Sequence, residues 1–218
     1  MKTDTQLQRD VLDEMKWQPS IKDAEVGVAV KDGVVTLSGF VDSYAKKLAA
    51  ERAAENVSGV RAVADDLKVK LPTTSQRSDT EIAHAALSAL KWNIEVPDSR
   101  IKLRVEDGWI TLEGDVDWQY QKNAAEECVR YLTGVKGTWN NLIVQQQKVS
   151  AYEVSKKIQD AMKRSATIDS QRISVEAKDG RITLKGTVRS WAERQDAENA
   201  AWAAPGVAFV DDQIAVGV

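Results

Sequence analysis

The sequence has very little of the residues that most often carry out chemistry, with one histidine and one cysteine among 218 residues. Cys128 has no partner for an internal disulfide, and one cysteine with one histidine cannot supply the usual ligand set of a zinc site. General acid–base and nucleophilic catalysis usually need a histidine or paired carboxylates beside a nucleophile, and the sequence has a single histidine, His84. We therefore expect no catalytic residue, no metal site and no cofactor, with His84 exposed on a helix and Cys128 a buried small residue.

Long apolar runs and strong net charge are also missing. No stretch approaches 18 uninterrupted apolar residues, and the N-terminus leads into a polar amphipathic segment. This pattern predicts no transmembrane helix and no signal peptide, and hence a cytoplasmic protein as written, with a peripheral position at a membrane as the alternative. A net charge of -3 without a run of Lys or Arg argues against nucleic acid as a partner. With 43% hydrophobic residues the chain is able to bury a core.

The sequence does contain a threefold internal repeat. Asp-Gly pairs at 32–33, 107–108 and 179–180 are each followed by Thr-Leu-x-Gly, and a Gly-Val pair comes 20 residues after the last glycine of each copy. Because these offsets recur at spacings of 75 and 72 residues, the chain is predicted to contain three tandem domains. We call them repeat 1 (3–71), repeat 2 (78–146) and repeat 3 (150–218), with a linker at 72–77.

Each repeat has the same order of predicted elements: helix, strand, strand, helix, strand. The first helix is predicted from capping boxes and an apolar residue at every fourth position, and the strands are predicted from apolar residues at every second position. The Asp-Gly pairs predict tight hairpin turns, and a stripe of small residues marks the second helix. The capping boxes are Thr3 with Gln6, Ser78 with Glu81, and Ser150 with Glu153. The expected fold class is α+β, with two helices on one face of a three-stranded sheet in each domain.

This succession of elements and motifs resembles the BON domain, the family named for bacterial OsmY and nodulation proteins. All three repeats carry the Asp-Gly, Thr-Leu-x-Gly and Gly-Val signatures, so the resemblance extends over nearly the whole chain. It implies small α+β domains of bacterial envelope and stress-related proteins, with phospholipid or envelope proteins as partners. From the sequence as written, we expect the chain to differ from the best-known members in having three copies where two are common and in having no export signal.

Tryptophan is the most prominent residue type left to explain, with seven in the chain. Trp17 and Trp92 stand at matching places at the end of the first helix, directly after Lys16 and Lys91. An aromatic ring beside a cation is typical of an interfacial anchor or of a protein-binding hot spot. The alternative is that both rings cap the sheet edge of their own domain.

The remaining aromatic residues of interest lie on the strands or at the start of the second helix. Trp109 stands where the other repeats have Val34 and Arg181, so we expect it on the outer strand face as part of the binding surface. Four further residues are predicted to lie at interfaces, either between domains or with another chain: Tyr44, Trp118, Trp139 and Trp191.

These observations predict a non-enzymatic bacterial binding protein of stress or envelope homeostasis. It is expected to dock to phospholipid headgroups or protein partners through Lys16, Trp17, Lys91, Trp92 and Trp109. The alternative is a homo-oligomer that associates through Trp17, Trp92, Trp109 and Trp139 into a ring or pore that passes or holds small solutes.

Overall fold

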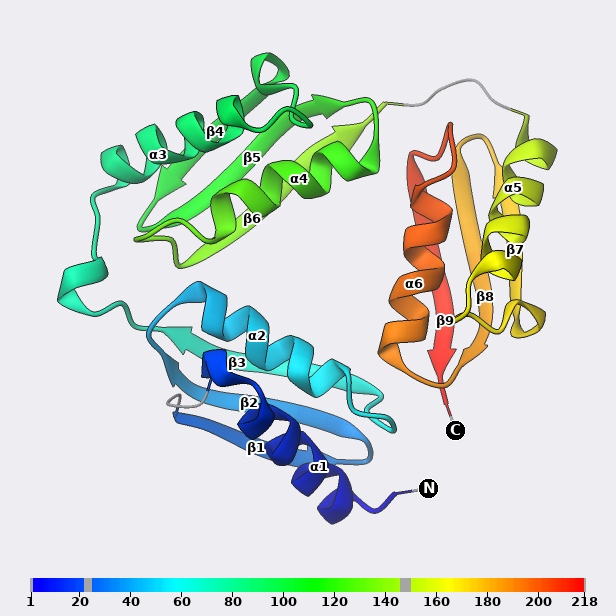
Figure 1. The fold of residues 1–218 in the computed structure, drawn as a ribbon, viewed down its shortest axis with the longest axis horizontal. Coiled ribbons are helices and arrows are strands. Elements are labelled where there is room, and N and C mark those ends of the chain that lie inside the picture. Colours follow the sequence, from blue (N-terminus) through cyan, green and yellow to red (C-terminus); the bar gives the residue numbers. More distant parts are fainter. Residues whose placement is uncertain (1, 22–24, 146–149, 218) are drawn as a thin grey trace.

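A computed structural model describes residues 2–21, 25–145 and 150–217, and within them each repeat has the predicted order of elements (Figure 1). Repeat 1 consists of α1 (Asp4–Trp17), β1 (Glu25–Lys31), β2 (Val34–Val41), α2 (Tyr44–Glu55) and β3 (Ala62–Val69). Repeat 2 consists of α3 (Asp79–Trp92), β4 (Ile101–Glu106), β5 (Trp109–Val116), α4 (Gln119–Arg130) and β6 (Gly137–Val144). Repeat 3 consists of α5 (Ala151–Arg164), β7 (Ile173–Lys178), β8 (Arg181–Val188), α6 (Trp191–Trp202) and β9 (Phe209–Val216).

Short 3₁₀ helices accompany these elements. One precedes the first strand of each repeat, and one lies within the predicted linker. They are η1 (Pro19–Ile21), η2 (Thr73–Ser75), η3 (Asp98–Arg100) and η4 (Ser170–Arg172).

The three sheets share one topology. The middle strand of each pairs antiparallel with the first strand through the hairpin, and parallel with the third strand through the second helix. The register also matches, because Leu37, Leu112 and Leu184 lie opposite Val28, Leu103 and Val175. The two helices of each repeat cover one face of its sheet and leave the other face open (Figure 1). The predicted fold class is confirmed.

The hairpin turns depend on backbone conformations with positive φ. In repeat 1, φ is 53° at Asp32 and 77° at Gly33, and the Asp-Gly pairs of the other two repeats have nearly the same values. Two consecutive positive φ angles define the type I′ turn that matches the twist of a hairpin, and Asp and Gly adopt them at low cost. In repeats 1 and 2 a carboxylate from the start of the first helix also accepts hydrogen bonds from the turn, Asp4 from Asp32 N–H at 2.9 Å and Asp79 from Asp107 N–H at 2.9 Å.

The helix starts are confirmed in two repeats and differ in the third. Complete capping boxes begin α1 at Thr3 and α3 at Ser78. Ser150 is the N-cap of α5, but its side chain makes no capping hydrogen bond, so the predicted third box does not form. The backbone at this N-cap also differs, because ψ is 126° at Ser150 against 157° at Thr3 and 153° at Ser78.

Each repeat buries a core of its own. The core forms where the apolar stripe of the first helix and the small-residue stripe of the second helix meet the inner face of the sheet. Ala53, Ala125 and Ala201 are fully buried on the second helices, where a small side chain lets the helix lie close to the strands. A fold with its own core in every repeat leaves the outer sheet faces and helix ends available for other roles.

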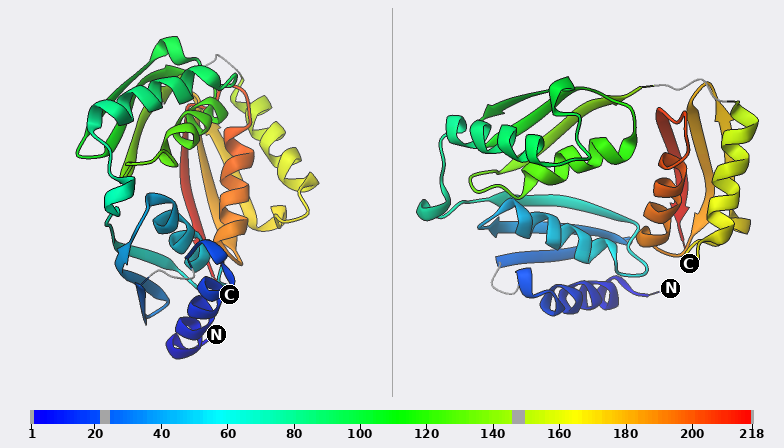
Figure 2. Two further views of the ribbon diagram at one scale, coloured as in Figure 1. Left: turned by 60° about the vertical axis from the view of Figure 1, so that its left-hand side comes forward. Right: turned by 45° about the horizontal axis from the view of Figure 1, so that its top comes forward.

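The three repeats are arranged around a common centre (Figures 1 and 2). The second helices α2, α4 and α6 lie nearest to that centre, whereas α1, α3 and α5 lie at the periphery. The N- and C-termini lie near each other in all views, so repeat 3 returns to repeat 1.

Candidate functional site

Three large apolar side chains are exposed along and just after the last turns of α3, where Lys91 is also found. We call these residues the Trp92 surface and define it as Leu87, Lys91, Trp92 and Ile94. Trp92 is 87% exposed, Leu87 is 52% exposed and Ile94 is fully exposed. These exposures contradict the alternative in which the ring caps its own sheet. Leu87 and Ile94 escaped the sequence analysis, although Ile94 stands where repeat 1 has Pro19 and could have been noticed there.

The end of α1 looks similar in sequence but differs in its charges. Trp17 is 82% exposed, yet Lys16 beside it forms an ion pair with Asp13 at 3.2 Å. A second acid, Glu14, is next to Asp13 in the sequence. On α3 the positions of these two acids are Ser88 and Ala89. The helix α3 has three charged residues among its 14, where α1 has six. The two tryptophans are therefore equally accessible but differ in how polar their surroundings are.

The outer face of the sheet of repeat 2 carries a second aromatic group. The indole of Trp109 on β5 stacks on that of Trp139 on β6, with ring centroids 5.5 Å apart and an interplanar angle of 22°. Trp109 is 37% exposed and Trp139 is 59% exposed. The structure brings together two residues that the sequence analysis had treated separately, because the parallel register places Thr111 opposite Trp139 and Trp109 opposite Gly137.

Three of the remaining aromatic residues lie where repeats meet. Tyr44, the first residue of α2, packs against the core of repeat 2, with its Oη 3.4 Å from Thr138 Oγ1. Trp118, the N-cap of α4, lines a hollow together with Trp202 at the end of α6. Trp191, the first residue of α6, packs against the core of repeat 1. The helices α2 and α6 thus contact the next repeat in cyclic order, and α4 shares a hollow with α6 of the next repeat.

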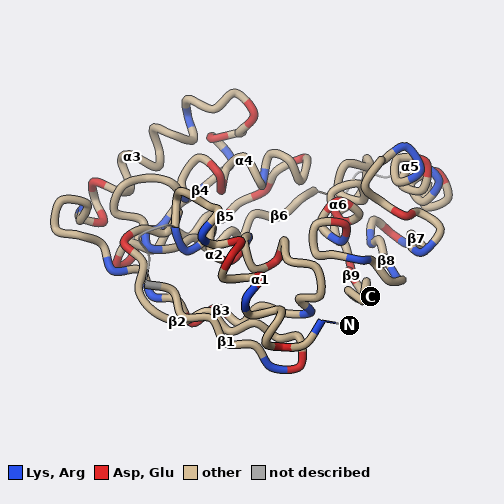
Figure 3. The backbone as a smooth tube through the Cα atoms, turned by 60° about the horizontal axis from the view of Figure 1, so that its bottom comes forward, with Lys and Arg blue, Asp and Glu red and all other residues tan. Residues whose placement is uncertain are grey.

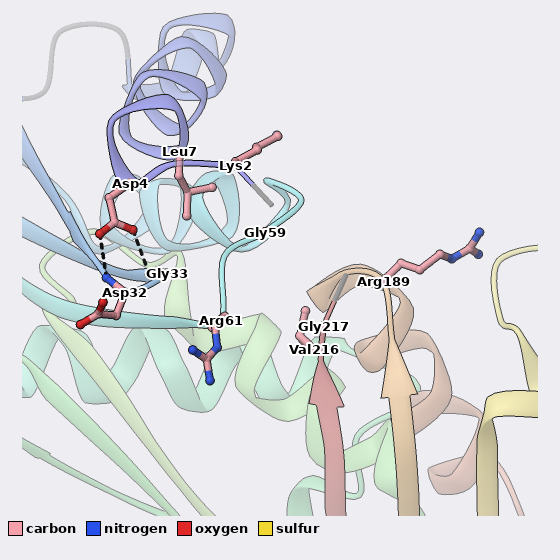
Figure 4. A pocket seen from close by; sticks show the side chains of 10 residues that line it. All are labelled: Lys2, Asp4, Leu7, Asp32, Gly33, Gly59, Arg61, Arg189, Val216 and Gly217. Atoms are coloured by element: carbon pink, nitrogen blue, oxygen red, sulfur yellow. Dashed lines mark hydrogen bonds between the residues drawn. The ribbon is translucent and has the colours of Figure 1, made fainter.

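A cavity of about 520 Å³ lies at the contact between repeats 3 and 1 (Figure 4). The Asp4 carboxylate in its wall already has a hydrogen-bond partner within the protein, because it accepts a hydrogen bond from Gly33 N–H at 3.2 Å. The charged ends of Lys2, Arg61 and Arg189 line or flank the cavity but do not converge on one point (Figure 4). The arrangement is that of a domain junction and offers no focused anion site.

The two side chains most suited to catalysis or metal binding, His84 and Cys128, lie apart from the other described groups of that kind. His84 is exposed on α3, and Cys128 is only half-buried, where its Sγ accepts a hydrogen bond from Asn93 Nδ2 at 3.0 Å. The expectation of a buried Cys128 is met only in part, because the side chain packs against the core of repeat 2 but is half-buried, with Asn93 at the end of α3 beside it. Within residues 2–21, 25–145 and 150–217, no three His, Cys, Asp or Glu side chains are grouped so that they could hold a metal ion.

Among the helices of the described ranges, none combines the length and the apolar character needed to cross a membrane. In the view of Figure 3, Lys and Arg are interspersed with Asp and Glu along the elements.

One carboxylate has a strongly structural role. Glu193 on α6 is 4% exposed and accepts hydrogen bonds from Asp169 N–H and Arg189 N–H, both at 2.9 Å. Burial by itself raises the pKa of Glu193, but the two backbone bonds and the Arg189 guanidinium outweigh it and lower the pKa below the ordinary value. The sequence analysis missed this residue, because repeat 2 has Gln121 and repeat 1 has Lys46 at the same place.

Other shifts on the second helices follow from burial. Burial raises the pKa of Glu51 and of Glu55 on α2, and burial lowers the pKa of Lys122 on α4. In each case desolvation disfavours the charged form. Burial is the largest cause of each pKa shift, and the neighbouring carboxylates of Glu55 and Asp65 add to the rise at Glu51.

Comparison with known proteins agrees with this architecture. The BON domain matches three times, at residues 3–70, 78–146 and 152–218. Over 127 residues the chain is 34% identical to the Osmotically-inducible protein Y of Escherichia coli (strain K12), which covers 56% of this chain and 63% of that protein. The chain thus spans less than two thirds of that relative's length.

Two solved structures of CdsD, a structural protein of the Type III secretion system of Chlamydia trachomatis, are also similar. One is 15% identical, covers 96% of this chain and 91% of its own, and has a TM-score of 0.28. The other, of the C-terminal domain, is 15% identical, covers 100% of both chains and has a TM-score of 0.27. TM-scores this low carry no argument about the fold or function of the chain.

Proposed function

Because the chain belongs to the BON-domain family, we propose that it is a non-enzymatic binding protein of osmotic stress or envelope homeostasis that docks to phospholipid headgroups. The main contact is the Trp92 surface, and Trp17 with Lys16 adds a weaker one. The observation that carries the proposal is the exposure of Trp92 and Ile94 directly after Lys91, at the peripheral end of a helix.

The physical basis is the amphipathic character of these side chains. An indole and two aliphatic groups enter the boundary between headgroups and acyl chains, while a lysine remains at the level of the lipid phosphates. Among the described residues, Lys91 makes no ion pair within the protein, whereas Lys16 is engaged by Asp13. Repeat 3 has Arg164 at the position of Trp92, so it does not supply a third contact of this kind.

Electrostatics limits the affinity. A chain of net charge -3 is repelled by an anionic surface as a whole, and one lysine contributes only about 1 kcal/mol near such a surface. We therefore expect modest binding that weakens as salt is added, with most of the affinity coming from the apolar side chains.

Vesicle co-sedimentation tests the proposal, with anionic phosphatidylglycerol vesicles beside neutral phosphatidylcholine vesicles. Burying an exposed large apolar side chain contributes about 1.5 to 3 kcal/mol when complete, so Trp92→Ala is expected to weaken binding roughly tenfold or more. Ser88→Asp introduces the acid that repeat 1 has at this position and is expected to weaken binding without touching any apolar group. Trp17→Ala is expected to have a smaller effect.

Trp139→Ala is the matched control, because it removes an exposed tryptophan of the same repeat from a different face. It should bind vesicles as the unaltered chain does. Equal binding by the double variant Trp17→Ala/Trp92→Ala would contradict the proposal.

A further inference from the structure

Trp109 and Trp139 form a built platform on the outer face of the β4-β5-β6 sheet. We define the indole platform as these two rings, with a rim of Lys102, Glu113 and Asn141. A methyl group added at Gly137 would collide with the Trp109 ring, so the glycine provides the space in which that ring lies flat against β6. Thr111, although on the outer face, is nearly buried beside the two rings. The pair is therefore held in one arrangement by its neighbours.

The fold does not require this pair. Repeat 1 has Val34 and Ala64 at the matching positions, and repeat 3 has Arg181 and Asp211. Both repeats form the same sheet with the same register without a stacked pair of indoles. An exposed aromatic pair that only one of three equivalent folds contains points to binding and not to stability.

The rim supplies hydrogen-bonding groups beside the rings. Glu113 lies opposite both Lys102 and Asn141 in the strand register, one step along the same face from Thr111 and Trp139. All three rim side chains are exposed, and within the described part of the chain none of them has a hydrogen bond or ion pair to another protein group. They are free to donate and accept hydrogen bonds with a ligand that lies on the rings.

The chemistry of this surface fits a neutral polyhydroxylated ring. The negatively charged faces of indoles attract the partially positive C–H groups on one side of a pyranose, while its hydroxyl groups reach a polar rim. Lys102 and Arg104 balance Glu106 and Glu113 around the platform, so there is no net charge to favour an anionic lipid. We propose that the indole platform binds a neutral glycan composed of pyranose units.

The size of the platform argues against a second copy of the chain as occupant. Aromatic side chains bury roughly 150 to 250 Å² each, so the exposed 37% of Trp109 and 59% of Trp139 amount to at most roughly 240 Å². A stable protein interface buries about 800 Å² on each partner. One or two sugar rings match the smaller area.

The test titrates the full chain with two neutral probes, cellohexaose and the hexamer of N-acetylglucosamine, and follows tryptophan fluorescence and NMR line broadening of the sugars. The expected result is saturable binding of at least one probe, weakened at least tenfold by Trp139→Ala. Repeat 1 has alanine at this position, so the variant should fold. Trp139→Phe keeps a ring and should retain part of the affinity.

Trp92→Ala is the control that separates this site from lipid docking, and it should bind the sugars normally. Failure of both probes to bind at millimolar concentration would overturn the proposal, as would unchanged affinity of Trp139→Ala. Light scattering in the same buffer tests whether a second copy of the chain occupies the platform. A dimer that Trp139→Ala dissociates would assign the platform to a second copy and overturn the glycan proposal.

Discussion

Repeats 2 and 3 build the same fold around matching residues and present different surfaces. Leu112 and Leu184 are both fully buried on the middle strand, and Gly114 and Gly186 both adopt positive φ where a side chain would collide with the preceding 3₁₀ helix. At matching outer positions, repeat 2 has Trp92 and Trp139 where repeat 3 has Arg164 and Asp211. The comparison teaches that the core determines the fold of each repeat, while the exposed positions are free to acquire binding roles.

The platform position of repeat 3 shows the alternative use of the same place. There Arg181 lies over the ring of Phe209, with its guanidinium carbon 4.0 Å from the ring centroid, in place of the stacked indoles. The cation lies against one face of the aromatic ring, and Phe209 remains 46% exposed. The same sheet position thus carries a stacked pair of indoles in repeat 2 and a cation–aromatic pair in repeat 3.

The largest expected effect tests whether the two cores are equivalent and independent. Leu112→Ala and Leu184→Ala each leave a cavity in a fully buried site, so each should lower the free energy of unfolding of its own repeat by about 2 to 5 kcal/mol. Hydrogen exchange followed by mass spectrometry along a urea series assigns the loss to a repeat. Leu87→Ala, at a half-exposed position, should stay within about 0.5 kcal/mol. A loss spread evenly over all three repeats would show that they unfold as one unit.

A smaller effect sharpens the comparison at the start of the second helix. Repeat 2 uses the neutral Gln121 to accept hydrogen bonds from Asp117 N–H and Trp118 N–H, whereas repeat 3 uses the buried carboxylate of Glu193. Glu193→Gln should cost repeat 3 about 1 to 3 kcal/mol at pH 7, because one buried N–H group loses its acceptor.

The pH dependence of this difference follows from the lowered pKa of Glu193. The ionised carboxylate stabilises the folded state fully above the ordinary value of 4.5, and this contribution is lost as the pH falls through the lower pKa of the folded state. The difference in the free energy of unfolding between the unaltered chain and Glu193→Gln should therefore shrink as the pH falls from 5 to 3, as measured by urea unfolding. Glu176→Gln, which removes an exposed ion pair with Lys185, is the control and should cost less than about 1 kcal/mol. A gap that stays constant with pH would contradict the role of the charge.

The fold could be predicted because its turns and helix starts depend on residues close together in the sequence. The candidate sites were harder to predict because they depend on contacts between residues far apart in the sequence. Asp-Gly pairs and the capping boxes at Thr3 and Ser78 act over a few residues, so their outcome could be read from the sequence. Ser150 shows the limit of this approach, because the residue types of a capping box are present there and the box does not form. The stack of Trp109 on Trp139 depends on the parallel register of β5 and β6. The helix α4 separates these strands in the sequence, so no local pattern specifies their register.

The contacts between repeats were less predictable still. Tyr44 and Trp191 stand at matching positions, and each reaches the core of another repeat, but nothing within a repeat specifies which neighbour lies there. Trp202 lines a junction although its counterparts, Glu55 and Arg130, are charged.

The smallest expected effect on stability concerns the contact through which repeat 3 returns to repeat 1. Trp191 packs against the core of repeat 1, but its indole N–H is buried without a hydrogen-bond partner, a cost of about 1 to 3 kcal/mol that offsets much of the gain from burying the ring. Trp191→Ala should therefore change the free energy of unfolding by less than about 1 kcal/mol and yet increase the radius of gyration in small-angle X-ray scattering, because the ring of contacts opens. Trp191→Phe keeps the ring without the unpaired N–H and should remain compact, whereas Trp17→Ala, far from any junction, should leave the scattering unchanged. An unchanged radius for Trp191→Ala would show that the other contacts, and not this side chain, hold repeat 3 against repeat 1.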